Sequence, residues 1–418
     1  MPTGCRVCAT PLAALMLLAL ALPGWTADAP KAAAVLREAA QLTARSQDLQ
    51  TRALSLATVA VGWARIDRAQ YDALAGEATE VASAIGDPMV RCLALRTVAV
   101  RLAKVDSKQA MTVLAQAHEA AQAHKVVVEK AVALREIAIA ALNLDAADAA
   151  AWMTEALEAA RKVPDPLSRS ACLRDLAAGI VIRQPNVAQD AFSESEKSLQ
   201  GVPATDPELP LARAELAAAW APTNLEAARR VVAGITEPTH RPLALGMVAR
   251  SLAPTSPELA LVLAQEIADE PSRAHVVAMA AAALPAEQAT MAEGLARVAL
   301  HGLGEATGAV ADDTRAAIAQ ALALTNRQEA VALCDRIADE DQRNAARAAV
   351  AQRVAGSDPR GALAIVEHID DPLVTEPVVS AAAVALAKTA PDEALTLARK
   401  ILGRRQRVEC LVAIAAYR

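Results

Sequence analysis

Three arginines stand at the same place in successive copies of a repeated pattern and could bind anionic groups. Arg96, Arg135 and Arg174 follow one another at a spacing of 39 residues. In a stack of repeats such positions form a row on one face, and a row of guanidinium groups can hold the carboxylates or phosphates of an extended partner. These three arginines are the candidate binding residues for an anionic partner. The alternative is that each pairs with a neighbouring acid, such as Glu136 or Asp175.

No other residues have the spacing of a catalytic or metal site. His118 and His124 are six positions apart and lie on different sides of a helix, whereas a helical metal site uses residues four apart. The glycine-rich segment 302–308 lacks the preceding strand and the terminal lysine of a phosphate-binding loop. No serine is flanked by the glycines of a nucleophile elbow. The sequence predicts no catalytic residue, no metal ligand and no cofactor, so we do not expect an enzyme.

The elements that must position the arginines are copies of a short repeat. Eight basic residues each precede, by seven and eight positions, an apolar residue and then an alanine. Three further copies lack the basic residue and end in Leu216-Ala217, Ile318-Ala319 and Val384-Ala385. About eleven units result, spaced at roughly 39 residues as far as about residue 208 and at roughly 32 residues after it. The eight basic residues, called heads below, are Arg52, Arg91, Lys130, Arg169, Arg241, Arg273, Arg343 and Arg407.

Each unit has the sequence signature of a helical hairpin. An acid followed by proline, as in Asp87-Pro88 and Asp165-Pro166, is typical of a helix start, because the carboxylate can accept hydrogen bonds from free amides and proline fits the first turn. Aliphatic residues at helical spacing give each helix an apolar stripe that neighbouring units must bury. We interpret the repeated alanine as the crossing point of adjacent helices. The predicted fold is all-α, a right-handed α-solenoid of about eleven stacked helical hairpins. At ~9 Å between helices it would form an open groove roughly 100 Å long.

The composition agrees with close helix packing and indicates export. Hydrophobic residues make up 54% of the chain but aromatic residues only 2%, and a net charge of −6 does not favour nucleic acid as a partner. Arg6 precedes an apolar run from Leu12 to Leu22 and then small residues, which is the pattern of a secretory signal peptide and is too short to span a membrane. We expect a signal peptide over residues 1–29 and a repeat domain over residues 30–418, without a membrane span, in the periplasm or outside the cell. The four cysteines of that domain are scattered among units, and we expect buried free thiols.

Two sets of segments resemble known repeat families. The stretches DPMVRCLALRTVAVRLA, DPLSRSACLRDLAAGI and DEDQRNAARAAVAQRVA resemble a HEAT-type helix, in which an acid and an arginine precede an alanine-rich run. The stretches PELALVLAQEI, PRGALAIVEHI and PDEALTLARKI are similar to the second helix of tetratricopeptide-type repeats. The resemblance implies a curved scaffold for protein or peptide binding.

Together these observations favour an exported, non-catalytic repeat scaffold that binds a protein or peptide along its concave face. Two alternatives stay open. A HEAT-like repeat enzyme of the lyase type needs a deep polar cleft lined by aromatic residues, and a purely structural envelope protein needs no ordered charge on any face. We interpret a basic cluster near the C-terminus as the solvated cap that ends such a stack. This cluster consists of Arg399, Lys400, Arg404, Arg405 and Arg407.

Overall fold

The computed structural model describes residues 29–418, and over that range it contains α-helices, one short 3₁₀ turn and no strand. The predicted signal peptide lies outside the described residues, apart from its last residue, Ala29, which begins α1. The even-numbered helices are α2 (Leu49–Trp63), α4 (Pro88–Leu102), α6 (Val127–Asn143), α8 (Pro166–Ile180), α10 (Leu209–Trp220), α12 (His240–Leu252), α14 (Glu270–Ala283), α16 (Ala309–Leu322), α18 (Glu340–Val354), α20 (Pro372–Leu386) and α22 (Arg404–Ala415). The odd-numbered helices are α1 (Ala29–Ala44), α3 (Arg68–Ser83), α5 (Ser107–Gln122), α7 (Ala149–Arg161), α9 (Pro185–Gln200), α11 (Leu225–Ala233), α13 (Pro257–Ala264), α15 (Ala289–Leu303), α17 (Arg327–Asp335), α19 (Pro359–Ile365) and α21 (Pro391–Lys400).

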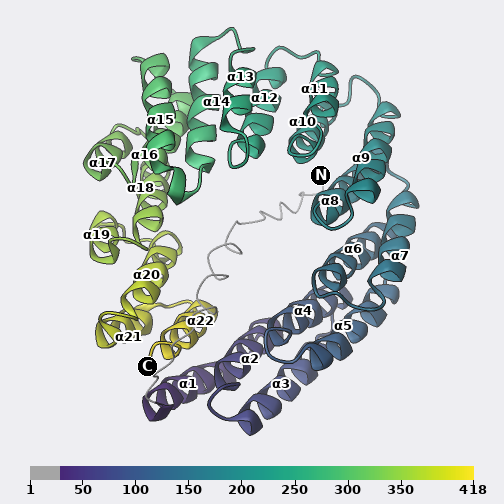
Figure 1. Ribbon diagram of the computed structural model, residues 1–418, viewed down its shortest axis with the longest axis vertical. Coiled ribbons are helices and arrows are strands. Elements are labelled where there is room, and N and C mark those ends of the chain that lie inside the picture. The colour runs from purple at the N-terminus through teal and green to yellow at the C-terminus, as the bar shows by residue number, and fades with distance from the viewer. Residues whose placement is uncertain (1–28) are drawn as a thin grey trace.

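The helices form two layers. Each even-numbered helix packs against its even-numbered neighbours, and from α2 to α20 each also packs against the odd-numbered helix that follows it. The even-numbered helices line the inside of the molecule and the odd-numbered helices lie at its periphery (Figure 1). This arrangement confirms the predicted all-α solenoid of helical hairpins.

Aspartate side chains cap the N-termini of many of the even-numbered helices. Asp87 accepts a hydrogen bond from the amide of Val90 at 2.9 Å, and Asp165 accepts one from the amide of Ser168 at 2.8 Å. Proline follows each of these aspartates, as the sequence predicted. The hydroxyl and amide of Ser168 lower the pKa of the Asp165 carboxyl, so this cap is charged near neutral pH.

Replacing Asp165 with alanine is expected to lower the free energy of unfolding by about 1 kcal/mol, because the first turn of α8 loses its acceptor. The depressed pKa means that the contribution of Asp165 is present at neutral pH and is lost as the pH falls through that pKa. Urea unfolding followed by circular dichroism measures the effect. Asp190, an exposed acid within α9, is the matched control, and an equal loss for Asp190→Ala would contradict the capping role.

The basic heads join each unit to the end of the preceding helix. Five of them donate a hydrogen bond to the carbonyl oxygen six residues earlier, over 2.6 to 3.2 Å, and the acceptor is always a buried isoleucine or valine. Carbonyl groups at a helix end lack intrahelical donors, so the arginine satisfies a group that would otherwise be unpaired. The five pairs are Arg91 with Ile85, Arg169 with Val163, Arg273 with Ile267, Arg343 with Ile337 and Arg407 with Ile401.

The repeated alanines lie where neighbouring helices cross. Ala60, Ala99, Ala138 and Ala177 are completely buried in the common core. One predicted register is wrong: in α20 the buried pair is Ala382-Ala383, two residues before Val384-Ala385. In the units of the first four heads, the helix cap lies four residues before the head. Asp371 caps α20, so the equivalent of the head there is Thr375, which the alanine pattern alone did not reveal.

The change in unit length lies in the outer layer. The helices α3, α5 and α9 each have 16 residues, whereas α11, α13, α17 and α19 have 9, 8, 9 and 7. The even-numbered helices keep similar lengths throughout. Losing about two turns from an outer helix shortens the unit by about seven residues without changing which face of the inner helix is buried.

The stack closes into a ring. The last even-numbered helix, α22, packs against α20 on one side and against α2 on the other, and α1 lies against α22 as the odd-numbered helix of its hairpin. Figure 1 shows both ends of the described chain meeting at this seam. The expected open groove of roughly 100 Å is therefore wrong, because the units curve enough for the eleventh hairpin to be completed by the first helix of the chain.

Side chains from distant parts of the sequence hold the seam. Arg399 of α21 forms a bidentate pair with Glu38 of α1, at 3.0 and 2.7 Å. Arg404 donates to the carbonyl oxygen of Arg45 at 2.7 Å. A methyl group at Gly62 in α2 would lie 2.6 Å from Leu36 Cδ2, so an alanine here would require the Leu36 side chain of α1 to move. The predicted solvated cap is thus corrected: two members of the basic cluster bind α1 and the loop after it.

Candidate functional site: the concave face

The face of each even-numbered helix that turns away from the outer layer follows from its buried positions. In α4 the buried residues lie on one side of the helix. They are Cys92, Ala94, Leu95, Val98, Ala99 and Leu102. At 100° per residue the opposite arc holds positions 2, 5, 6, 9, 10 and 13 after the head. We call these positions the concave face. In units without a basic head they are counted from Leu209, Ala311 and Thr375.

The three predicted arginines lie side by side on this face, at position 5 of α4, α6 and α8. Arg96 pairs with Glu136 at 3.1 Å, Arg135 pairs with Glu136 at 2.9 Å and with Asp175 at 2.8 Å, and Arg174 pairs with Asp175 and with Glu215 of α10. The arginines and acids thus alternate in a continuous belt across four helices. The belt consists of Arg96, Glu136, Arg135, Asp175, Arg174 and Glu215, so the neighbouring acids do occupy the arginines.

Two further arginines run across the concave face. Arg101 of α4 reaches over α2 to bind Glu409 of α22 at 2.8 Å and also contacts Thr58. Arg353 of α18 reaches over α16 and donates to the carbonyl oxygens of Ala282 and Leu284, at 3.1 and 2.6 Å. Burial lowers the pKa of both guanidinium groups, since it removes water from the charged form. Sequence reasoning missed both residues, because their partners belong to units that are not adjacent.

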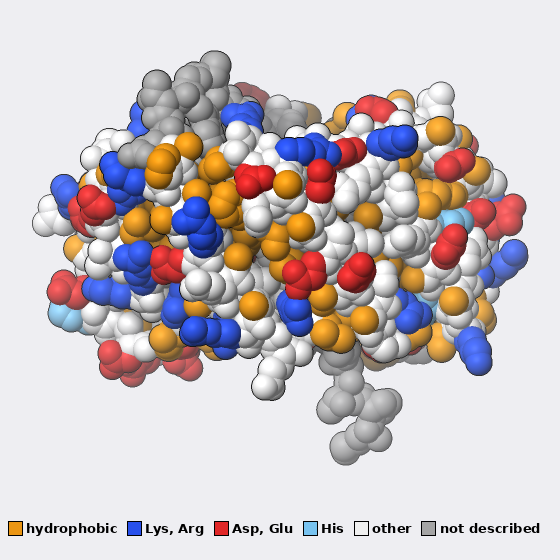
Figure 2. Space-filling model, turned by 90° about the horizontal axis from the view of Figure 1, so that it is seen from below, with side chains coloured by type: hydrophobic (Ala, Val, Ile, Leu, Met, Phe, Trp, Pro, Cys, Tyr) orange, Lys and Arg blue, Asp and Glu red, His pale blue; other side chains and the backbone are white. Residues whose placement is uncertain are grey.

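The concave face is basic although the chain is acidic. Over the eleven even-numbered helices and the turns directly after them, its positions carry nine basic and five acidic side chains, a net charge of +4, against −6 for the whole chain; Arg65, Lys104 and Lys388 lie in those turns. The basic residues are Arg65, Arg96, Arg101, Lys104, Arg135, Arg174, Arg250, Arg353 and Lys388, and the acids are Glu136, Asp175, Glu215, Asp313 and Glu409. On the outer side of the ring shown in Figure 2, by contrast, acidic and basic side chains are interspersed.

Large apolar side chains are strongly exposed on one part of this face. Leu211 in α10 and Leu243 in α12 are 46% and 49% exposed at equivalent positions, and Ile182, just after α8, is 93% exposed. Met247 follows Leu243 by one helical turn and is half-buried. Arg250 lies one turn further along α12, is exposed, and forms no ion pair in the part of the chain that the structure describes. We call Leu211, Leu243, Met247 and Arg250 the concave patch.

His118 and the four described cysteines lie away from the concave positions. His118 of α5 binds Glu155 of α7 at 2.7 Å and stacks on Trp152, which joins two outer helices. Residues 29–418 contain no group of three or more histidine, cysteine or acidic side chains placed to hold a metal ion. All four described cysteines are free and buried, which confirms the expectation. Burial raises the pKa of Cys92, Cys334 and Cys410 to about 12.

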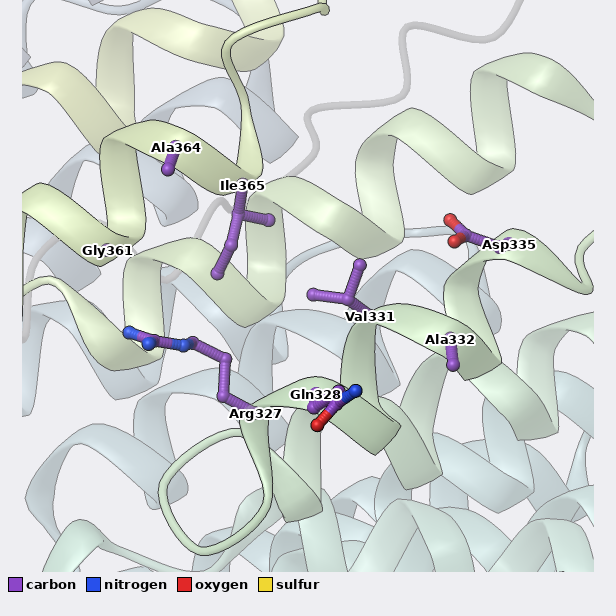
Figure 3. A pocket seen from close by; sticks show the side chains of 8 residues that line it. All are labelled: Arg327, Gln328, Val331, Ala332, Asp335, Gly361, Ala364 and Ile365. Carbon is purple, nitrogen blue, oxygen red and sulfur yellow. The ribbon is translucent and has the colours of Figure 1, made fainter.

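A groove of about 660 Å³ opens on the outer surface between α17 and α19. Val331 and Ile365 point into the space between these helices, and Arg327 extends towards Gly361 at one end (Figure 3). The charged groups of the groove already have partners, since Arg327 pairs with Asp358 and Asp335 pairs with Arg347. The groove results from the short outer helices, and its charged side chains are already paired.

Comparisons with known proteins do not assign the chain to a family. No family model and no curated protein matches it. Among solved structures it is similar to the crystal structure of Ton1535 from Thermococcus onnurineus NA1, with 17% sequence identity and a TM-score of 0.36, over 84% of this chain and 96% of that chain. So low a score carries no further argument. The helices themselves define the class: an all-helical repeat protein whose hairpins close into a ring. No described helix has both the length and the apolar character to cross a membrane.

Proposed function

We propose that the protein is an exported, non-catalytic repeat scaffold whose concave face binds a protein or peptide. The observation that carries the proposal is the ordered charge on that face. A belt of alternating arginines and acids spans α4 to α10, and the face as a whole is basic within an acidic chain. A purely structural spacer needs no such arrangement on its inner side.

Arg96, Arg135 and Arg174 orient the bound partner but add no net positive charge to the concave face. The three acids of the belt balance their charge, so the partner's carboxylates exchange places with the acids of the belt or bind the guanidinium edges that remain free. The excess positive charge comes from residues such as Lys104, Arg250 and Lys388, which form no ion pair within residues 29–418. These unpaired basic residues attract an acidic partner, and the belt positions it.

Substitution of Arg96, Arg135 and Arg174 by alanine is expected to reduce recovery of the partner about tenfold in a crosslinking pull-down from the native envelope fraction. The matched control replaces three arginines of the outer layer, Arg161, Arg230 and Arg360, which also pair with acids of neighbouring helices. The control variant is expected to keep the partner, and both variants are expected to keep the far-ultraviolet circular dichroism of the wild type.

The possible outcomes separate the candidate functions. Equal recovery by the wild type and the concave variant would exclude the arginine belt as the binding element. No enriched partner with any of the three proteins would favour the structural or the enzymatic alternative. Fractionation of the native cells tests export, because an exported chain is recovered outside the cytoplasm without its first residues.

A further inference from the structure

The concave face is not uniform, and one part of it has the character of a contact surface. At the concave positions of the even-numbered helices, the large apolar side chains that are more than 40% exposed are Leu211 and Leu243, which lie at the same position of two consecutive units. Ile182 is also strongly exposed, but it lies in the turn after α8. Elsewhere on the face the aliphatic side chains are half-buried, as are Val100 in α4 and Ile139 in α6. Apolar surface that stays exposed in one place is typical of a surface that a partner covers.

The side chains around these residues indicate which kind of partner this surface fits. Arg250 supplies one exposed positive charge without a carboxylate partner at the edge of the apolar surface. On the neighbouring helix α10, Ala218 and Ala219 at positions 9 and 10 are small, whereas Glu215 at position 6 is an acid whose charge is already paired with Arg174. Small side chains let a bound backbone approach the helices closely. A ligand with both apolar side chains and a negative charge therefore complements the patch.

We propose that the concave patch binds a segment of a protein partner that carries leucine-like side chains next to an acidic residue. The proposal rests on the proposed function, because it names the partner chemistry of the same face. Leu211, Leu243 and Met247 receive the apolar side chains, and Arg250 binds the carboxylate. The inner wall of a closed ring cannot lie against a flat bilayer or against a second ring of the same size, whereas an extended or helical segment can reach it.

The test measures the binding of three fluorescent twelve-residue peptides by anisotropy. The first contains leucine, serine and glutamate, the second has lysine in place of glutamate, and the third has serine in place of leucine. The first peptide is expected to bind at least about tenfold more tightly than either of the others, because it alone offers both the apolar side chains and the negative charge. Vesicles of anionic phosphatidylglycerol are expected not to sediment the protein.

Substitutions locate the binding surface. Leu211→Ser with Leu243→Ser is expected to weaken the first peptide about tenfold, and Arg250→Gln about fivefold. The matched controls are Leu259→Ser, which changes an exposed leucine of the outer helix α13, and Arg37→Gln, which changes an exposed arginine of α1. Neither control is expected to alter binding, and because all these side chains are exposed, the thermal unfolding of each variant is expected to match that of the wild type.

Two results would overturn the proposal. Equal binding of the three peptides would show that the patch does not recognise leucine and glutamate side chains. Unchanged binding by the Leu211 and Leu243 variant would show that the peptide binds elsewhere. The envelope pull-down separates these failures from failure of the proposed function. A partner that depends on the arginine belt but is still recovered by the patch variant leaves the scaffold in place and removes the patch from its binding surface.

Discussion

Deleting α1 is expected to open the ring and to destabilise the protein by on the order of 5 kcal/mol or more. The helix buries Ala32, Val35, Leu36 and Ala39 in the common core, and burial of a leucine side chain alone contributes about 1.5–3 kcal/mol. Without α1 the last hairpin lacks its outer helix, and the apolar surfaces of α2 and α22 become exposed to water. A chain that begins at Asp48 is therefore expected to unfold at a lower temperature and to have a larger radius in small-angle X-ray scattering.

A pair of point substitutions provides the matched control for the deletion. Leu36→Asp places a charge in the seam and is expected to reproduce most of the loss, whereas Ala34→Asp, on the exposed side of the same helix, is expected to leave stability nearly unchanged. Equal unfolding temperatures for these two variants and the wild type would contradict the role of α1 in closing the ring.

Chemical crosslinking reports the closed ring directly. With cysteine at the positions of Glu38 and Arg399, a short bismaleimide is expected to join the two ends within one chain, because the native side chains are hydrogen-bonded to each other. The four native thiols of residues 29–418 do not interfere, since they are buried and burial raises the pKa of their thiol groups. Crosslinks that form only between chains would show that the seam is open in solution.

Ala99→Leu is expected to lower the free energy of unfolding by about 2–3 kcal/mol. Ala99 is completely buried in α4, which packs against the neighbouring inner helices and its outer helix, so three added carbon atoms have no free volume to occupy. Because each inner helix of the ring is held on both sides, the helices cannot move apart without disturbing their neighbours. Thermal and urea unfolding followed by circular dichroism measure the loss.

Ala150→Leu is the control for this substitution. Ala150 lies on the exposed side of the outer helix α7, where the same three carbon atoms meet solvent, and we expect a change within about 0.5 kcal/mol. An equally small effect of Ala99→Leu would mean that the buried alanines do not set the distance between the inner helices. That result would remove the physical reason for the repeated alanine.

The hairpins could be predicted from the sequence because local chemistry specifies them. Aspartate caps, prolines in first turns and apolar stripes each act within a few residues, and the alanine after each head marks a buried crossing point. The closure into a ring depends on small rotations summed over all units, which no local pattern records.

The candidate site was predicted in part. The common spacing of Arg96, Arg135 and Arg174 places them on one face, and Glu136 and Asp175 were identified as their possible partners. The partners of Arg101 and Arg353 could not be predicted, because each side chain crosses an entire helix to reach a unit that is not adjacent. The exposure of Leu211 and Leu243 depends on the curvature of the ring, which also lies beyond a local pattern.

The pairing of α1 with α22 also determines when folding can finish. During synthesis α1 emerges first and its partner last, and the contact between Glu38 and Arg399 joins residues 361 positions apart. Inner hairpins can fold as each is completed, but the apolar side of α1, including Leu36, stays without its partner until the whole chain is available. We therefore expect ring closure to be the last and slowest step, since a contact of such long range adds the largest loop-closure cost to folding. A chain truncated before α22 is expected to expose the apolar side of α1 and to aggregate more readily than the closed ring.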